Sequence, residues 1–209
     1  MSVEYQGLAV RASQGDVAAF RELVQEHSAL VYRVALRILG ATDAQDASQE
    51  VWVRVWRNIG RFRGESAFST WLYRITVNTC LTVRRKESRR DEREQGEEMP
   101  YLSEPSGGDA DPEAAALSAE RRAEIQAALG HVRAEHRVAL VLRHMEGLSY
   151  AEIAEVMDVP DGTAKGWVSR GRAAMLLILS QGDNATRGVG LGGVLPGRVR
   201  KTPGISPGK

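Results

Sequence analysis

Apolar residues recur at intervals of three and four along most of the chain, which is the spacing of amphipathic helices. The first such stretch covers residues 15–39 and stops at Gly40, a residue that often ends a helix. The second covers residues 44–59, and Thr42 or Asp43 can cap its first turn. No stretch alternates apolar and polar residues over the length of a strand, so the pattern predicts an all-α protein.

A loop containing two glycines and two phenylalanines follows over residues 60–69. Ser69 or Thr70 can cap a third helix, whose apolar period ends in the basic run 84–93. The period resumes at Pro112, a good first helical position. From there the pattern predicts helices over 112–129, 133–145, 149–157 and 163–179.

The helices fall into two groups, which predicts two small helical domains. We expect the first domain over residues 1–93 and the second over 112–180. Residues 94–111 hold Gly, Pro, Ser and acids with little to bury, which indicates a flexible acidic linker. The Gly- and Pro-rich basic stretch 181–209 is expected to be a disordered tail.

The net charge of +1 over 209 residues hides two charged blocks. Eleven basic residues stand against four acidic ones between Arg54 and Arg93, and nine acids stand against one arginine between Asp91 and Glu113. A cationic block within folded sequence is a candidate nucleic-acid surface. No apolar run approaches the roughly 20 residues of a membrane span, and no signal-peptide pattern opens the chain. The single cysteine, Cys80, fits a reducing cytoplasm and excludes an internal disulfide.

Aromatic and basic residues alternate around the loop and the start of the third helix. Bases of single-stranded nucleic acid stack on such rings while arginines hold the phosphates. Asn78, one turn beyond Arg74, can both donate to and accept from a base edge. In the alternative interpretation Trp71 and Phe68 simply fill a small core, whereas Phe62 lies on a polar loop and is better placed to stack.

Residues 149–172 are typical of a DNA-binding helix-turn-helix. Ser149 is a good cap, Ala154 is small where two helices would cross, and Pro160 stops the first helix. The second helix would begin at Thr163 and carry Lys165 and Arg170 toward base edges or phosphates. A helical hairpin that only packs is the alternative.

The second helix of the chain has a polar side that carries two tryptophans. Tryptophan is enriched at interfaces, and the charged residues beside Trp52 and Trp56 would orient a protein partner. A solvated helix face with core tryptophans is the alternative.

Two stretches resemble bacterial RNA polymerase sigma factors of the extracytoplasmic-function (ECF) group. DAQDASQEVWVRVWRNIGRFRGESAFSTWLYRITVNTCL is similar to their second conserved region, and VALVLRHMEGLSYAEIAEVMDVPDGTAKGWVSRGRAAM to their fourth. The order of the two stretches also matches the family. The resemblance implies a protein that binds core RNA polymerase, through the β′ coiled coil and the β flap, and gives it promoter specificity. An anti-sigma factor is a further implied partner.

The resemblance also assigns residues to each contact. Docking on core polymerase would use Asp46, Gln49, Glu50, Trp52 and Arg54. Reading and melting of the −10 element, as duplex and single strand, would use Phe62, Arg63, Ser66, Phe68, Trp71, Arg74 and Asn78. The −35 element would be read through Thr163, Lys165, Gly166, Ser169 and Arg170. Gly166 departs from the family's usual polar residue and costs the helix about 0.5–1 kcal/mol relative to Ala.

Two other function classes are alternatives to a sigma factor. A DNA-binding regulator that works without polymerase would share the helix-turn-helix but would not bind the core enzyme. An enzyme is disfavoured because the four histidines form no metal-binding motif and Cys80 has no base near it in sequence. We therefore expect no catalytic residue, no metal site, no cofactor and no membrane insertion.

Overall fold

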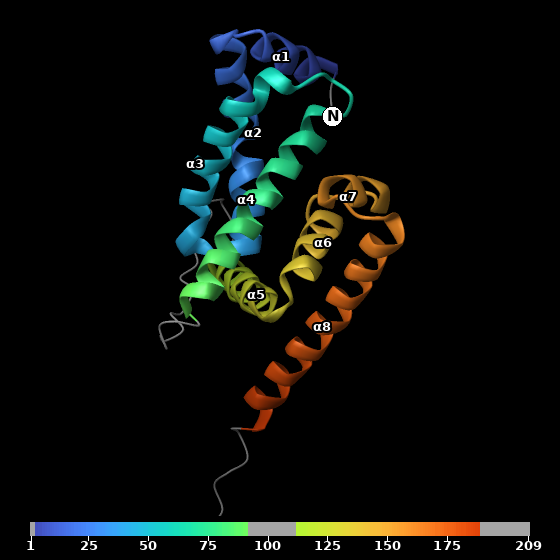
Figure 1. Cartoon of the computed structure of the whole chain (residues 1–209). Coiled ribbons are helices and arrows are strands. Elements are labelled where there is room, and N and C mark those ends of the chain that lie inside the picture. The colour runs from blue at the N-terminus through green and yellow to red at the C-terminus, as the bar shows by residue number, and fades with distance from the viewer. Residues whose placement is uncertain (1–2, 92–111, 189–209) are drawn as a thin grey trace, which may run out of the picture.

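The computed structural model describes residues 3–91 and 112–188, and almost all of them are helical (Figure 1). The elements are α1 (Val3–Ser13), α2 (Val17–Leu39), α3 (Ala41–Asn58), the 3-10 turn η1 (Ile59–Arg61), α4 (Phe68–Asp91), α5 (Pro112–His131), α6 (Ala134–His144), α7 (Tyr150–Met157) and α8 (Asp161–Gly188). No strand occurs in these residues, so the all-α prediction is confirmed. The expected acidic linker lies outside the described residues.

Helices α1–α4 form the N-terminal module. Asp16 caps α2, because its carboxylate accepts hydrogen bonds from the backbone N–H groups of Ala18 and Ala19. Gly40 ends α2 with φ 95°, a conformation that favours glycine, and α3 begins directly after it. Thr42 and Asp43 therefore lie inside α3, and the predicted cap at these residues is wrong. One buried cluster contains residues from all four helices of this module: Leu8, Ala9, Ala12, Ala19, Leu23, Val31, Val51, Val55, Ile59, Phe62, Phe68 and Leu72.

Helices α5–α8 form the C-terminal module, whose α7–turn–α8 unit is the predicted helix-turn-helix. Ser149 caps α7 in a capping box with Glu152. Asp158 ends α7 with φ 55°, and Val159 is half-buried in the turn. The helix α8 begins at Asp161, so Thr163 lies in its first turn instead of capping it. No proline occurs between Pro160 and Pro196, and α8 continues to Gly188, past the predicted end at residue 179.

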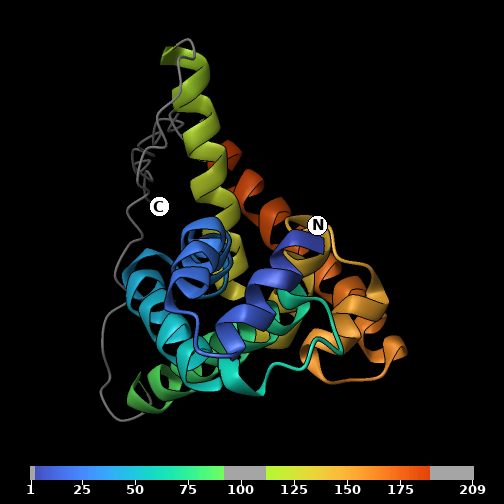
Figure 2. The same ribbon diagram turned by 90° about the horizontal axis from the view of Figure 1, so that it is seen from above.

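The two modules pack against each other, which the sequence pattern did not predict (Figures 1 and 2). One buried cluster crosses the boundary: it joins Val34 and Ile38 of α2 and Val77 of α4 to Val138 of α6 and Ile153 of α7. In both views α4 runs beside the C-terminal module, and Arg74 of α4 is paired with Asp158 at 3.2 Å.

Buried polar groups also join the modules. Glu146 follows α6, and its side chain is only 2% exposed. It accepts two hydrogen bonds from Arg33, at 2.9 and 2.7 Å, and one from the hydroxyl of Tyr73 at 2.9 Å. Arg137 of α6 is 1% exposed and donates to the carbonyl of Ile38, at the end of α2, at 2.7 Å. Such charge-assisted bonds are geometrically demanding, so they define one relative placement of the modules.

The described helices include none long and apolar enough to span a bilayer. The same residues hold no group of three or more His, Cys, Asp or Glu side chains that suits a metal ion.

Candidate nucleic-acid interface

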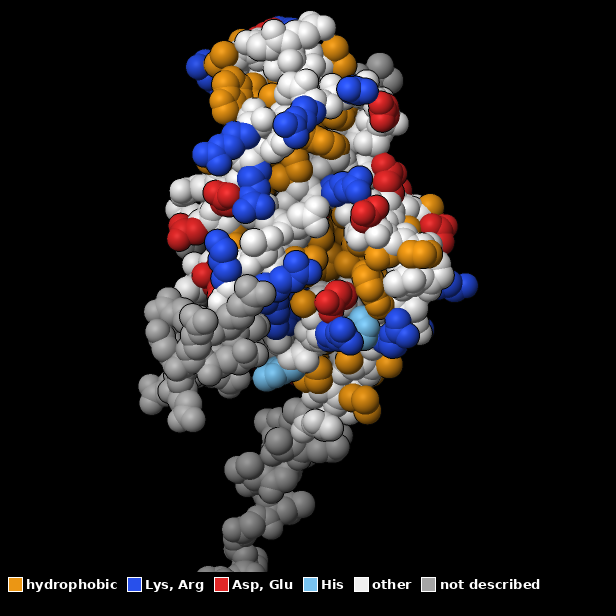
Figure 3. Space-filling model, in the orientation of Figure 1, with side chains coloured by type: hydrophobic (Ala, Val, Ile, Leu, Met, Phe, Trp, Pro, Cys, Tyr) orange, Lys and Arg blue, Asp and Glu red, His pale blue; other side chains and the backbone are white. Residues whose placement is uncertain are grey.

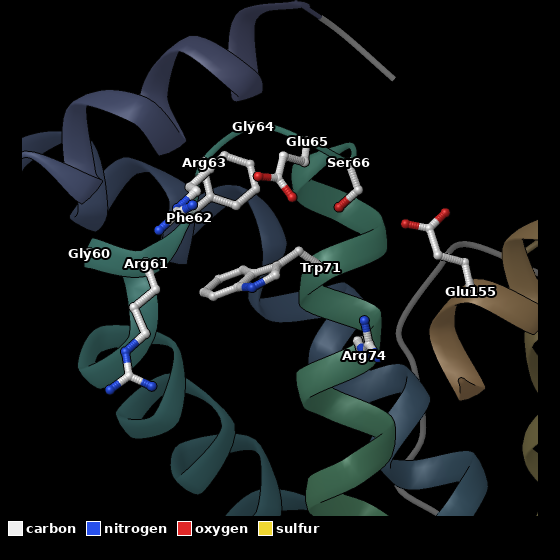
Figure 4. Close-up of a pocket in the computed structure, with 10 residues that line it drawn as sticks. All are labelled: Gly60, Arg61, Phe62, Arg63, Gly64, Glu65, Ser66, Trp71, Arg74 and Glu155. Carbon is white, nitrogen blue, oxygen red and sulfur yellow. The ribbon is translucent and has the colours of Figure 1, made fainter. Parts of the chain in front are cut away.

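A pocket of about 670 Å³ lies between the loop after η1 and the first turns of α4 (Figure 4). Ten residues line it: Gly60, Arg61, Phe62, Arg63, Gly64, Glu65, Ser66, Trp71, Arg74 and Glu155. Nine come from the N-terminal module, and Glu155 reaches the opening from α7. The predicted −10 residues Arg63, Ser66, Trp71 and Arg74 are thus brought together around one hollow.

The loop that forms the pocket is held from α1. The side-chain amide of Gln6 donates to the carbonyls of Gly64, at 3.3 Å, and Ser66, at 3.1 Å. Its oxygen accepts the backbone N–H of Phe68 at 3.0 Å. The sequence pattern predicts no helix before residue 15 and gives Gln6 no role, because these contacts span about sixty residues.

The phenylalanines of the loop belong to the core. Phe62 is 6% and Phe68 2% exposed, and their rings meet edge to face at 5.8 Å. Phe68 also contacts the ring of His27, at 5.3 Å. Phe62 also lines the pocket, and its stacking on a base stays a prediction. Trp71 is half-buried, 5.5 Å from Phe62, and its ring still lines the pocket.

A shallower groove of about 320 Å³ continues between α3 and α4. Trp71, Arg74 and Asn78 line it from α4, with Ile75. Arg54 and Asn58 line it from α3, with Arg61 of η1. Basic side chains are spread over the face that carries α3 and α4 (Figure 3). Arg54 is one of the predicted polymerase-binding residues, whereas Asn58 has no role in the sequence-based prediction.

The remaining polymerase-binding candidates lie along α3. Asp46 and Gln49 are exposed, and Glu50 pairs with Arg54 at 2.7 Å. The hydrogen bond from Arg54 lowers the pKa of the Glu50 carboxyl. Trp52 is half-buried, with its ring 6.3 Å from that of Phe20.

Trp56, which the sequence pattern placed beside Trp52 on the candidate interface, is the more exposed tryptophan of α3. Its side chain is 48% exposed, and its ring lies 4.7 Å from Phe20. Exposure of a tryptophan on a polar helix is a signal for an interface. Residues four apart lie on the same face of a helix, so periodicity alone does not tell which of Trp52 and Trp56 is exposed. The packing against Phe20 and the neighbouring helices decides it.

The outer face of α8 carries most of the predicted −35 residues. Lys165, Ser169 and Arg170 are exposed, whereas Thr163 and Gly166 are half-buried. The guanidinium of Arg170 lies over Gly166, 3.2 Å from where a Cβ atom on that glycine would be. A side chain at 166 would therefore compete with Arg170 for this part of the helix surface.

Two family models match the chain. The model of Sigma-70 region 2 covers residues 23–90, and that of Sigma-70 region 4 covers residues 122–175. The ECF RNA polymerase sigma-E factor of Haemophilus influenzae is 36% identical over 176 residues, which are 80% of this chain and 90% of that protein. The chain belongs to the ECF sigma factors.

The relative from Escherichia coli K12, also an ECF RNA polymerase sigma-E factor, is 35% identical over 174 residues, which are 81% of this chain and 91% of that protein. Among solved structures, CnrH in complex with the cytosolic domain of CnrY matches with a TM-score of 0.60 at 25% identity, over 84% of this chain and 97% of that one. The sigma factor RpoE of Bartonella quintana, in complex with the anti-sigma factor NepR, has a TM-score of 0.64 at 22% identity and shows the shared fold. That match covers 78% of this chain and 98% of the Bartonella quintana chain.

Membership in the family establishes the function in outline. This sigma factor directs promoter recognition in the initiation of transcription. The groove and all of the pocket except Glu155 lie in the region 2 match, and the helix-turn-helix lies in the region 4 match.

Proposed function

We propose that this sigma factor binds core RNA polymerase and opens promoters by holding the −10 non-template strand on the N-terminal module. The observation that carries the proposal is the arrangement of Trp71, Arg74 and Asn78 along one side of α4, where they line the pocket and the adjoining groove. The half-buried ring of Trp71 is available for a displaced base, and Arg74 for a phosphate. Binding the open strand more tightly than the duplex shifts the equilibrium toward the open form.

In this proposal the exposed residues of α8 read the −35 element. Lys165 and Arg170 are placed for phosphates and base edges, as the second helix of a helix-turn-helix requires. The α3 face with Asp46 and Gln49 docks on the β′ coiled coil, and the C-terminal module meets the β flap. The acidic residues 94–111 serve as the tether between modules, since their carboxylates suit a channel built for a phosphate backbone.

The proposal also covers partners and place of action. The chain acts in the cytoplasm, by binding alone and without a catalytic step of its own. An anti-sigma factor is a proposed regulator, supported by the fold shared with Bartonella quintana RpoE, which was solved with NepR.

The test is transcription in vitro with core polymerase on a library of random promoters. We expect transcripts to be enriched for templates that share two short elements separated by a constant spacing. Omission of the protein is the control, and co-purification with core polymerase is the second measurement. Absence of both initiation and core binding would contradict the proposal and favour a regulator that works without polymerase.

A further inference from the structure

The pocket loop takes its shape from one side chain of another helix. Gln6 uses both its donor and its acceptor on three backbone groups of the loop: the carbonyls of Gly64 and Ser66, and the N–H of Phe68. Backbone hydrogen bonds flank this segment, from Phe62 N–H to Ile59 and from Trp71 N–H to Ala67. Gln6 therefore supplies hydrogen-bond partners to backbone groups of the loop that the regular turns on either side do not reach.

The backbone conformation of Gly64 and the space beside it allow Gln6 to approach the loop. Its φ of 75° is accessible mainly to glycine, and it turns the carbonyl toward the amide. A Cβ atom on Gly64 would lie 3.3 Å from Nε2 of Gln6, closer than most such contacts allow. The conformation of the loop and the approach of Gln6 thus depend on the same residue.

The helix that carries Gln6 is itself firmly placed. Leu8, Ala9 and Ala12 of α1 are buried in the core of the module. Tyr5 donates to Glu26 of α2 at 3.1 Å, and its ring lies 5.0 Å from that of His27. The amide of Gln6 is therefore held at a constant position relative to α2 and to the pocket.

We propose that Gln6 is a positioning residue for promoter opening: it holds the loop 62–67 in the shape that receives the displaced −10 base. This inference rests on the proposed function, because it concerns the same pocket. A loop ordered before DNA arrives loses less conformational freedom on binding, so the open strand is bound more tightly. Gln6 lies outside the pocket lining and acts through the loop alone.

The experiment compares two templates of a promoter selected from the random library, using holoenzyme assembled from core polymerase and the full chain. One template is a fork whose −10 non-template strand is already single-stranded, and the other is fully paired duplex spanning only the −35 element. We expect Gln6→Leu, which removes all three hydrogen bonds, to weaken fork binding about ten- to a hundredfold. Binding to the −35 duplex and to core polymerase should stay unchanged.

Two further variants separate positioning from general support. Gln6→Glu keeps the acceptor for Phe68 N–H but turns a carboxylate toward the carbonyls of Gly64 and Ser66. We expect it to weaken fork binding at neutral pH even if the thermal midpoint hardly changes. Gln25→Leu, at an exposed position of α2, is the matched control and should behave as the wild type.

The possible results are distinguishable. If wild-type holoenzyme initiates on no promoter, the proposed function itself has failed. If the wild type initiates but Gln6→Leu binds the fork as well as the wild type does, the role of Gln6 is wrong while the proposed function stands. Equal losses in fork, −35 duplex and core binding would also overturn it, because they would indicate a general loss of folding.

Discussion

At the scale of single residues, the predicted −10 side chains differ in their exposure. Asn78 and Arg74 are exposed on α4, whereas Phe62 and Phe68 are buried. The buried rings fix the base of the loop, and the exposed polar groups are left to make contacts. Asn78 is the cleanest position for a test, because its removal leaves the buried cluster untouched.

Asn78→Ala should weaken binding to an open −10 strand by about 1–3 kcal/mol, since the amide can make paired hydrogen bonds to a base edge. Duplex binding through α8 should remain within twofold of the wild type. Gel-shift titration of holoenzyme with the fork and the −35 duplex measures both, and Gln25→Ala is the control. Equal losses on the two templates would contradict this division of roles between the modules.

His27 links stability to pH. Its ring is 4% exposed, and burial lowers its pKa from the ordinary value near 6.5. As the pH falls through about 6.5, the unfolded chain binds a proton that the folded chain refuses, so stability is lost. Between pH 7.5 and 5.5 we expect this residue to contribute a loss of at most about 1.4 kcal/mol.

Urea unfolding of wild type and His27→Phe at both pH values measures this contribution. The variant should lose less stability on acidification than the wild type. The exposed Gln25, changed to Leu, is the control and should leave the wild-type pH dependence in place. An identical loss in wild type and His27→Phe would show that other groups are responsible.

At the scale of elements, two glycines of α8 have opposite roles. A Cβ atom on Gly171 would lie 2.8 Å from the Leu140 side chain and 2.9 Å from the carbonyl oxygen of His136. Gly171 thus permits the close approach of α8 to α6. At Gly166 the nearest group is the mobile end of the Arg170 side chain, which can move aside.

The same substitution should therefore have opposite effects at these two sites. Gly171→Ala should lower the free energy of unfolding by about 1–3 kcal/mol through overpacking against backbone. Gly166→Ala should raise it by up to about 1 kcal/mol, because alanine is the better helix former. Chemical denaturation of both variants gives the comparison. Stabilisation by Gly171→Ala would mean that α6 and α8 are less tightly packed than described.

At the scale of the whole molecule, the proposed function requires the two modules to lie farther apart than they do in this structure. Arg74 beside the pocket and Asp158 of the helix-turn-helix are 3.2 Å apart. Elements about 25 base pairs apart are separated by about 85 Å of duplex at 3.4 Å per base pair. The modules must therefore separate when both elements are engaged.

Energy transfer between dyes on the exposed Ala29→Cys of α2 and Ala173→Cys of α8 measures this separation. Cys80 is buried, which raises its pKa to about 12, so it should escape labelling. Transfer should be high in the free protein and fall in the promoter-bound holoenzyme.

Glu146→Gln should lower the transfer in the free protein, because it removes the charge that Arg33 contacts across the boundary. Glu22→Gln, an exposed change on α2, should have no effect. Low transfer in the free wild type would contradict the closed arrangement.

Local patterns in the sequence determined the helices and their family. The three- and four-residue periodicity predicted α2 through α7 and the start of α8 within a few residues, because it reflects which side of each helix is buried. The cap at Ser149 and the stop at Gly40 could also be predicted, since both depend on neighbouring residues. The same local character explains why the resemblance to sigma factors was evident from two stretches of sequence.

Only the tertiary structure decided which of these residues face a ligand and which face the core. The burial of Phe62, the exposure of Trp56 and the role of Gln6 depend on contacts between distant segments. The packing of the modules through Glu146 and Arg137 is of the same kind. Helix periodicity states that a face is buried but does not name the surface that covers it, so these features had to be read from the folded chain.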